Sequence, residues 1–302
     1  MDRLKAFEVF ATVVARGSFV RAAEALDTSP ANVTRYINEL EAHLGTRLLN
    51  RSSRKLSLTE SGEILHERCR VILDDVAEAE SQTSASTTRP RGRLRINVPV
   101  SFGILHLAPL WPKFMEKYPE VELDVVLADR VVDLVEEGFD LGIRISRGGS
   151  TSYSARKLAT SRNIVCASSG YLLQRPPPKH PSDLAQHACL GYTYAQTADE
   201  WNFVDTTGNK HSVKVRYAMY TNNGDTARAA AIMGCGVIWQ PTFLIGEDLR
   251  QKRLVELLPG YRMPNIEVLA VYPSRRHLSA KVRLMVDFLA QAFEGETAPW
   301  DR

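Results

Sequence analysis

Residues 18–55, SFVRAAEALDTSPANVTRYINELEAHLGTRLLNRSSRK, contain two short helical patterns followed by a basic, turn-rich segment. The first pattern opens at Ser18, a good N-cap, and places its apolar residues on one helical face. A second helix is expected to begin with Ser29 as N-cap and Pro30 as first residue, because the missing N–H of proline costs nothing there. Its apolar residues recur at helical steps until Gly45, which favours a C-terminal stop. Two helices joined by so short a turn predict a helix-turn-helix.

The polar face of the second predicted helix is suited to reading DNA bases. In a helix-turn-helix, the second helix enters the major groove and presents its N-terminal residues to base edges. The planar fork of Arg35 matches guanine, and the amide of Asn32 matches adenine. An ordinary helical hairpin inside a globular domain is the alternative, because amphipathic helix pairs are common. The residues predicted to contact DNA from this helix are Ser29, Pro30, Asn32, Thr34, Arg35 and Tyr36.

A basic hairpin is expected directly after this helix. Residues 46–58 contain four basic residues and no acidic one, around a serine turn flanked by leucines. A run of charge is usually a solvated surface, but a basic wing beside a helix pair is well placed to contact phosphates. Arg51, Arg54 and Lys55 are therefore predicted to contact the DNA backbone.

Residues 7–62 also carry a series of short motifs in fixed register. They are Phe7, Phe10, Val13, GSF at 17–19, AAEAL at 22–26, VTR at 33–35, Ile37, LE at 40–41, LG at 44–45, LL at 48–49, Arg51, LTE at 58–60 and Gly62. Together they resemble the N-terminal domain of LysR-type transcriptional regulators, which implies a protein that binds double-stranded promoter or operator DNA. The family usually has a small residue at the position of Asn32 and often a glutamine at that of Pro30. The base preference is therefore expected to differ from the common pattern.

The basic charge of the chain is local. The whole chain of 302 residues has a net charge of only +3, and residues 1–59 alone hold nine Lys or Arg against six Asp or Glu. This distribution indicates a DNA-binding element attached to a region with another task. The N-terminus is amphipathic rather than signal-like, and no apolar run is long enough to cross a membrane. The protein is expected to be cytoplasmic and to have no membrane partner.

The sequence contains no motif that predicts catalysis, a metal site or a cofactor. Cys69, Cys166, Cys189 and Cys235 are scattered without a C-x-x-C pair, which argues against a zinc site or a disulfide framework. Reduced thiols are expected, with a redox-sensing role for one of them as an open alternative. Nucleotide fingerprints and hydrolase or kinase motifs do not occur either.

A long helical pattern runs from Thr59 to about Ala85. Its apolar positions alternate at steps of four and three, and they are Leu65, Cys69, Ile72, Val76, Ala79 and Thr83. Such a seam needs a partner, which is either the helix's own domain or a second copy of the chain. Dimerisation is the preferred hypothesis, since a two-fold dimer supplies the second recognition helix for an inverted-repeat operator. The resemblance implies the same homodimer, and a homotetramer built from it. Residues 81–92 then read as a hinge.

From Arg93 onward, strand patterns alternate with helical patterns. Helices are expected at 101–119, 131–138, around 169–174, at 225–236 and at 279–293, and the alternation predicts a mostly parallel α/β sheet. Four segments, GFDLGIR at 138–144, CASSGYL at 166–172, GCGVIWQP at 234–241 and VRLMVDFL at 282–289, resemble the LysR effector domain. That domain is similar to periplasmic binding proteins, with two α/β lobes joined by crossover strands around a cleft.

Polar residues near the ends of the predicted strands are the candidates for effector binding. In open α/β sheets, ligands bind beyond the carboxyl ends of strands. The alternative is that Ser101, Asn223 and Asp225 are only helix caps and turn formers, and that Arg144 only pairs with an acidic neighbour. The predicted effector-binding residues are Ser101, Phe102, Arg144, Ser146, Tyr194, Asn223, Thr226, Pro241 and Thr242.

These patterns predict an α/β protein of three parts. They are a winged helix-turn-helix DNA-binding domain at 1–59, a linker and dimerisation helix with a hinge at 60–91, and an effector-binding domain at 92–302. Within the last part, lobe I is expected at 92–161 and 267–302, and lobe II at 162–266. The leading hypothesis is a sequence-specific transcriptional regulator controlled by a small organic effector, often anionic as the resemblance implies.

A solute-binding protein and a small-molecule enzyme built on the same lobes are the alternatives. The N-terminal unit and the lack of a signal pattern oppose the first. The second is opposed by the lack of an assembled nucleophile, base and orienting group, although seven scattered histidines leave it open.

Overall fold

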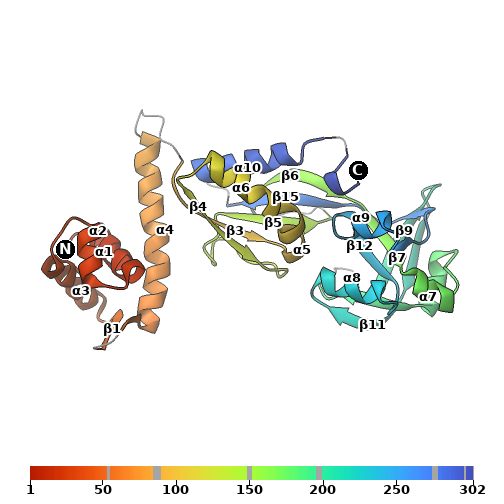
Figure 1. The fold of residues 1–302 in the computed structure, drawn as a ribbon, viewed down its shortest axis with the longest axis horizontal. Coiled ribbons are helices and arrows are strands. Elements are labelled where there is room, and N and C mark those ends of the chain that lie inside the picture. Colours follow the sequence, from red (N-terminus) through yellow and green to blue (C-terminus); the bar gives the residue numbers. More distant parts are fainter. Residues whose placement is uncertain are drawn as a thin grey trace. The chain divides into compact units, whose positions relative to one another are not determined.

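A computed structural model describes residues 1–52, 55–83, 90–147, 152–194, 199–273, 278–295 and 297–301. The chain forms two compact units, Met1–Arg89 and Pro90–Arg302. Figure 1 shows the helices of the first unit and the mixed helices and strands of the second.

The N-terminal unit is a helical domain with a small β-wing. Its elements are α1 (Arg3–Arg16), α2 (Phe19–Ala25), α3 (Pro30–Leu44), β1 (Leu49–Ser52), β2 (Lys55–Leu58) and α4 (Glu60–Thr83). Ser18 and Ser29 cap α2 and α3, accepting hydrogen bonds from backbone N–H groups three residues later. Gly45 ends α3 in the left-handed conformation, with φ of 68°. The predicted helix-turn-helix is thus confirmed together with its caps, and the predicted wing is present as the antiparallel pair β1–β2.

The wing is held against α3 and the start of α4. Glu41 Oε1 accepts hydrogen bonds from the backbone N–H groups of Leu48 and Leu49, at 2.8 and 3.2 Å. At the start of α4, a Cβ on Gly62 would lie 2.0 Å from the carbonyl oxygen of Leu48. Glycine at this position therefore allows the close approach that positions β1 next to α4.

Helix α4 divides its apolar seam between two environments. Cys69 is fully buried in the core of the N-terminal unit, and Leu65 packs against that core. Ile72, one turn later, is 38% exposed. The alternative of packing on its own domain therefore holds for the first part of the seam. The side chains of Ala79 and Thr83 are not among those described, and Ala85 lies outside the described residues.

The second unit has two lobes. Lobe I contains a five-stranded sheet in the order β4-β3-β5-β15-β6, formed by β3 (Gly92–Val98), β4 (Val121–Leu127), β5 (Leu141–Ser146), β6 (Ser154–Ser161) and β15 (Ile266–Tyr272). Strand β3 pairs in parallel with β4 and β5, whereas β15 pairs antiparallel with β5 and β6. Four of these five strands therefore run in the same direction, as the prediction of a mostly parallel sheet requires, and β15, which returns from the second lobe, runs opposite to them.

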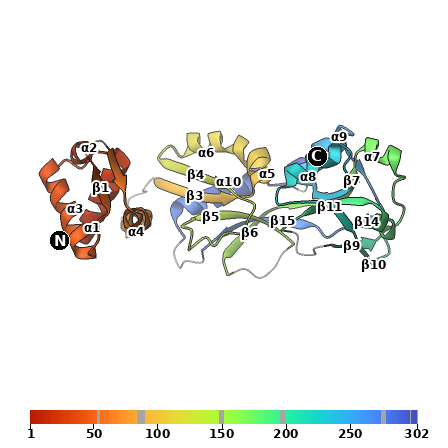
Figure 2. The same ribbon diagram turned by 90° about the horizontal axis from the view of Figure 1, so that it is seen from below.

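Lobe II contains three small sheets covered by short helices (Figure 2). The strands are β7 (Asn163–Ala167), β8 (Ala188–Tyr192), β9 (Glu200–Asp205), β10 (Lys210–Lys214), β11 (Arg216–Thr221), β12 (Ile238–Pro241), β13 (Val255–Glu256) and β14 (Tyr261–Arg262). The helices are α7 (Ser169–Gln174), α8 (Gly224–Ile232) and α9 (Thr242–Arg250). Trp201 and Phe203 on β9 are almost fully buried in the separate core of this lobe.

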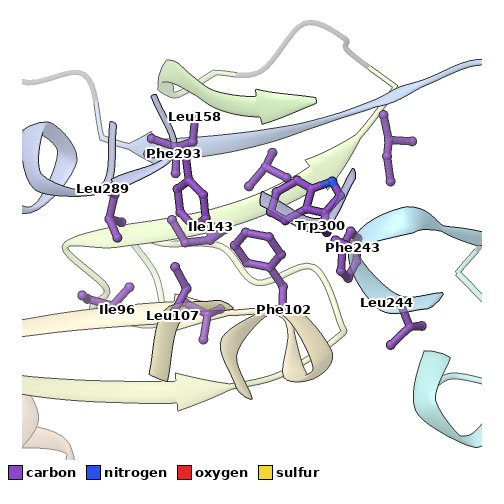
Figure 3. Close-up of a cluster of buried hydrophobic side chains, with 14 of the residues drawn as sticks. Ile96, Phe102, Leu107, Ile143, Leu158, Phe243, Leu244, Leu289, Phe293 and Trp300 are labelled. Carbon is purple, nitrogen blue, oxygen red and sulfur yellow. The ribbon is translucent and has the colours of Figure 1, made fainter. Parts of the chain in front are cut away.

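Two crossovers join the lobes, one between β6 and β7 and one between β14 and β15. Asn163 Nδ2 donates to the carbonyl of Pro264 at 2.7 Å, which ties the two crossovers together. A second hydrogen bond joins the first residue of α9 to the β6–β7 crossover, since the N–H of Thr242 donates to the carbonyl of Arg162 at 2.8 Å. The largest core cluster continues across this junction, and Figure 3 shows Phe102, Phe243 and Trp300 gathered within it.

Two of the predicted helices differ from the structure. Residues 101–119 form a series of short helices, α5 (Val100–Phe102), a π-turn at Gly103–Leu107, a 3₁₀ turn at Ala108–Leu110 and α6 (Trp111–Lys117), instead of one helix. Pro109 and Pro112, inside this stretch, lack backbone donors and break the regular pattern.

Residues 131–138 form turns instead of a helix. Asp133 Oδ1 accepts hydrogen bonds from the N–H groups of Val135 and Glu136, at 2.9 and 3.0 Å. This side chain therefore competes with helical hydrogen bonding. The adjacent β-branched valines disfavour the helix further. The predicted helices around 169–174, at 225–236 and at 279–293 are found as α7, α8 and α10 (Ala280–Ala292).

Candidate DNA interface and effector site

The N-terminal turns of α3 present a polar, exposed face. Asn32 is exposed and donates from Nδ2 to Thr28 Oγ1 at 3.3 Å. Arg35 is also exposed, and its guanidinium carbon lies 5.0 Å from the ring centroid of Tyr36. Thr34 is partly buried, and its hydroxyl donates a hydrogen bond to the carbonyl of Pro30 at 2.9 Å. Pro30 is exposed as well, but Asn32 and Arg35 are the exposed predicted residues inside α3 whose side chains can donate hydrogen bonds to base edges.

Arg35 makes one weak ion pair. Its Nη1 lies 3.4 Å from Glu39 Oε1, and the Arg35 side chain is 57% exposed. Exposed pairs at this spacing contribute little to stability. The guanidinium is therefore available to leave Glu39 and bind a base edge at small cost.

The wing places basic residues on two antiparallel strands. Arg51 pairs with Leu56 in the β1–β2 register, and Ser52 pairs with Lys55. Asn50 Nδ2 donates to the carbonyl of Leu58 at 3.0 Å, a side-chain hydrogen bond that links the two strands at the open end of the hairpin. The predicted phosphate contact Arg54 lies outside the described residues.

In the second unit, the structure brings several of the predicted effector residues together where the lobes meet. Ser101 is 6% exposed, and its Oγ donates to Asp225 Oδ2 at 2.5 Å. Asn223 caps α8, because its Oδ1 accepts from the N–H of Thr226 at 3.0 Å. The hydroxyl of Thr226 donates to the same oxygen at 3.1 Å. Asn223 therefore does cap a helix, with Thr226 as the donor to it, and Ser101 joins the two lobes.

Two carboxylates complete this meeting point. Asp129 accepts from the N–H of Val100 at 2.9 Å and from Asn223 Nδ2 at 3.3 Å. Asp225, on α8, accepts from Ser101. Sequence reasoning did not single out Asp129. It placed residues 223–226 near the cleft, with capping as the alternative for Asp225, and did not include Asp225 among the predicted effector-binding residues. The available signal was position, since Asp129 follows the carboxyl end of β4. Burial, and then the charge of Asp129, raise the pKa of the nearby Tyr192.

Phe102 lies in the core instead of at a surface. It is 0% exposed, and its ring centroid lies 5.1 to 5.7 Å from those of four aromatic neighbours, His106, Phe243, Phe293 and Trp300. Thr242 is also buried, with its hydroxyl 3.0 Å from Ser161 Oγ. Pro241 lies next to it at the end of β12, opposite Asn163.

Arg144 holds part of lobe I in place. Its guanidinium donates to Asn97 Oδ1 at 2.6 Å and to the carbonyl of Val132 at 3.1 Å. These acceptors are neutral, and within the described ranges no carboxylate lies at ion-pair distance. Burial lowers the pKa of the Arg144 guanidinium. The bond to Val132 connects β5 to the turns at 131–138.

Two further predicted residues have other surroundings. Ser146 ends β5 opposite Glu267. Tyr194 is 46% exposed and contacts Tyr192 edge to face, with ring centroids 5.8 Å apart. The effector-binding role of these residues stays a prediction.

Most of the cysteine thiols are buried. Cys69, Cys166 and Cys189 are buried, and Cys235 is exposed. Burial raises the pKa of Cys69 to about 11 and that of Cys189 to about 12. These two thiols therefore stay protonated at neutral pH, and a protonated thiol is a poor nucleophile.

Two family models match the chain. Residues 4–63 match the model described as bacterial regulatory helix-turn-helix protein, lysR family. Residues 87–294 match the model described as LysR substrate binding domain. This chain belongs to the LysR family of bacterial transcriptional regulators. That family consists of DNA-binding regulators instead of enzymes, so the solute-binding and enzyme alternatives give way to the leading hypothesis.

Relatives of this LysR family member share nearly its whole length. The HTH-type transcriptional regulator DmlR of Escherichia coli K12 is 37% identical over 294 residues, which are 96% of this chain and 94% of DmlR. The solved structure of CrgA, a LysR-type regulator from Neisseria meningitidis, is 33% identical with a TM-score of 0.59, covering 95% of this chain and 97% of CrgA. Full-length AphB, a virulence activator of Vibrio cholerae, gives a TM-score of 0.60 at 29% identity, covering 95% and 98% of the two chains.

None of the helices in the described part of the chain combines the length and apolar character that a membrane span requires.

Proposed function

We propose that this LysR family regulator binds an inverted-repeat operator as a homodimer, with α3 of each copy in the major groove and the wing on the flanking phosphates. The observation that carries the proposal is the exposed N-terminal face of α3. Ser29 caps this helix, and Asn32 and Arg35 stand outward within its first turns. Side chains at that end of a recognition helix meet base edges, and these two residue types match adenine and guanine.

The exposed part of the α4 seam supports pairing with a second copy. Ile72 continues the seam beyond the point where the helix packs on its own unit, and its side chain is exposed in the single chain. A second α4 would cover it and would also supply the second recognition helix. A homotetramer, which the family resemblance implies, would join two such dimers.

We place the small organic effector at the meeting point of the two lobes. Ser101, Asn223 and Asp225 connect lobe I with lobe II there through hydrogen bonds. A ligand at this point changes DNA binding only if it prefers one arrangement of the regulator, and such couplings are typically about 1 to 3 kcal/mol.

Mapping of genomic binding sites followed by footprinting of the full-length protein tests the proposed function. We expect protected regions with two half-sites related by two-fold symmetry. Protection of single, unpaired sites would contradict the dimer, and uniform protection of any DNA would contradict sequence-specific regulation. The genes next to the sites would indicate the chemistry of the effector.

The wing gives a separate prediction. Lys55→Ala should weaken binding to all DNA sequences alike and lower the slope of log affinity against log salt by about one unit, because one phosphate contact is lost. The measurement is fluorescence anisotropy on operator and random duplexes over a range of salt concentrations. Lys210→Ala, at an exposed position of the second unit, is the matched control and should leave the slope unchanged. An unaltered slope in Lys55→Ala would contradict the proposed contact between the wing and the phosphates.

A further inference from the structure

Five polar residues form a group at the meeting point of the lobes, which we call the inter-lobe cluster: Ser101, Asp129, Asn223, Asp225 and Gln240. Asp129 accepts from the N–H of Val100, and Asp225 accepts from the hydroxyl of the next residue, Ser101. The two carboxylates are therefore bound to one turn of lobe I. Asn223, which donates to Asp129, connects the same turn to α8.

Gln240 is the member whose side-chain amide is unpaired. Its side chain is only 6% exposed, and its amide makes no hydrogen bond to any other residue within the described chain. The small exposed part of Gln240 includes its amide atoms, which therefore remain accessible to a ligand. A Cβ built on Gly224 would lie 3.6 Å from Gln240 Oε1 and 3.8 Å from Ser101 Oγ, so the unpaired amide faces the cluster. The amide is thus an accessible polar group directed at the cluster.

The charges around the inter-lobe cluster are unfavourable for an anion. Arg228 lies nearest, with Nη1 3.8 Å from Asp225 Oδ1, but it is held by Asp248, to which its Nε and Nη2 both donate. Arg130, which follows Asp129 in sequence, forms a two-bond ion pair with Glu137. An added carboxylate would approach two carboxylates without an uncommitted cation among these neighbours, and like charges in a partly buried site repel strongly.

One other arginine lies near β12. Arg147 stands over the ring of Trp239, with its guanidinium carbon 5.7 Å from the centroid. Trp239 and Gln240 are consecutive strand residues, so their side chains point to opposite faces. Arg147 therefore does not neutralise the cluster.

We infer that the inter-lobe cluster binds the protonated amine of a small organic effector, an inference that rests on the regulator function proposed above. An ammonium group carries three donors and no acceptor. The carboxylates of Asp129 and Asp225 and the Oε1 atom of Gln240 are acceptors that match it. Asp225 can accept from an ammonium while it keeps the hydrogen bond from Ser101, because a carboxylate has about four lone-pair sites. This chemistry differs from the anionic effector that the family resemblance implies.

The test uses the full-length protein and length-matched probes. 1,4-Diaminobutane and ethanolamine are compared with succinate and glycolate at equal ionic strength, by thermal unfolding and titration calorimetry. We expect the two amines to raise the unfolding midpoint of the second unit and to release or take up heat on titration, whereas the two acids do neither. Asp225→Asn should weaken amine binding about tenfold or more, because a hydrogen bond to a charged group is lost. Asp287→Asn, which alters an exposed ion pair, is the control and should bind as the wild type.

A second variant covers the case in which Asp225→Asn fails to fold. Gln240→Leu keeps the volume and the contact between Ser101 and Asp225, and it should also reduce amine affinity. The inference is overturned if the acids bind and the amines do not, if neither amine binds, or if both variants fold and bind amines as the wild type. These outcomes leave specific DNA binding untouched. If the ligand-free wild type bound operator and random DNA equally well, the proposed function would be overturned instead.

Discussion

Phe102→Ala is expected to lower the free energy of unfolding of the second unit by about 3 to 5 kcal/mol, as large-to-small changes of a buried aromatic residue do. The Phe102 ring is 0% exposed and contacts four other aromatic rings, including those of Phe243 and Trp300. Since Phe243 lies at the start of α9 and Trp300 near the C-terminus, the cavity would loosen contacts between distant segments. Urea unfolding of the full-length protein measures the loss.

Leu105→Ala is the control for this substitution. Leu105 lies three residues later and is 43% exposed, so its truncation should change stability by less than about 0.5 kcal/mol. The transition of the N-terminal unit should not move in either variant. A loss below about 1 kcal/mol in Phe102→Ala would show that Phe102 is not a core residue, given the typical cost of such cavities.

Ile72→Glu is expected to separate the proposed dimer. In a paired α4 seam, the substitution would bury two like charges against each other, which should raise the dimer dissociation constant by about a hundredfold or more. Sedimentation velocity should then show smaller particles, and footprints should lose their paired half-sites. A single copy would still fold, because Ile72 is 38% exposed on its own unit.

Helix α4 offers a closely matched control. Ile64→Glu makes the same chemical change at a position that is 63% exposed and off the seam. This variant should keep the wild-type assembly and footprint. If Ile72→Glu also stayed dimeric with its two-fold footprint intact, pairing through α4 would be refuted.

The local features of this chain were predictable from the sequence, because each depends on neighbouring residues. The caps Ser18 and Ser29 and the stop at Gly45 are read directly from residue type and spacing, and the structure contains all three. Asp133 shows the limit of the same reasoning. The apolar spacing around it favours a helix, but the Asp133 side chain accepts hydrogen bonds from the N–H groups of Val135 and Glu136 and so stabilises a turn instead.

The long-range contacts could not be read from the sequence in the same way. Ser101 and Asp225 are far apart in the chain, as are Asp129 and Asn223, and they meet only because the crossovers bring the lobes together. Helix α9 was also not predicted. Its residues Thr242–Gly246 are all buried, so the segment lacks the polar face that marks a surface helix.

The central claim, that α3 reads DNA bases, is tested most directly by Arg35→Ala on operator and random duplexes at one salt concentration. We expect operator binding to weaken by about 1 to 3 kcal/mol, with base choice relaxed at one position in each half-site, while random DNA is bound nearly as before. Arg68→Ala, which removes an exposed arginine from α4, is the control and should preserve the preference for the operator. Equal loss of affinity for operator and random DNA in Arg35→Ala would contradict the claim.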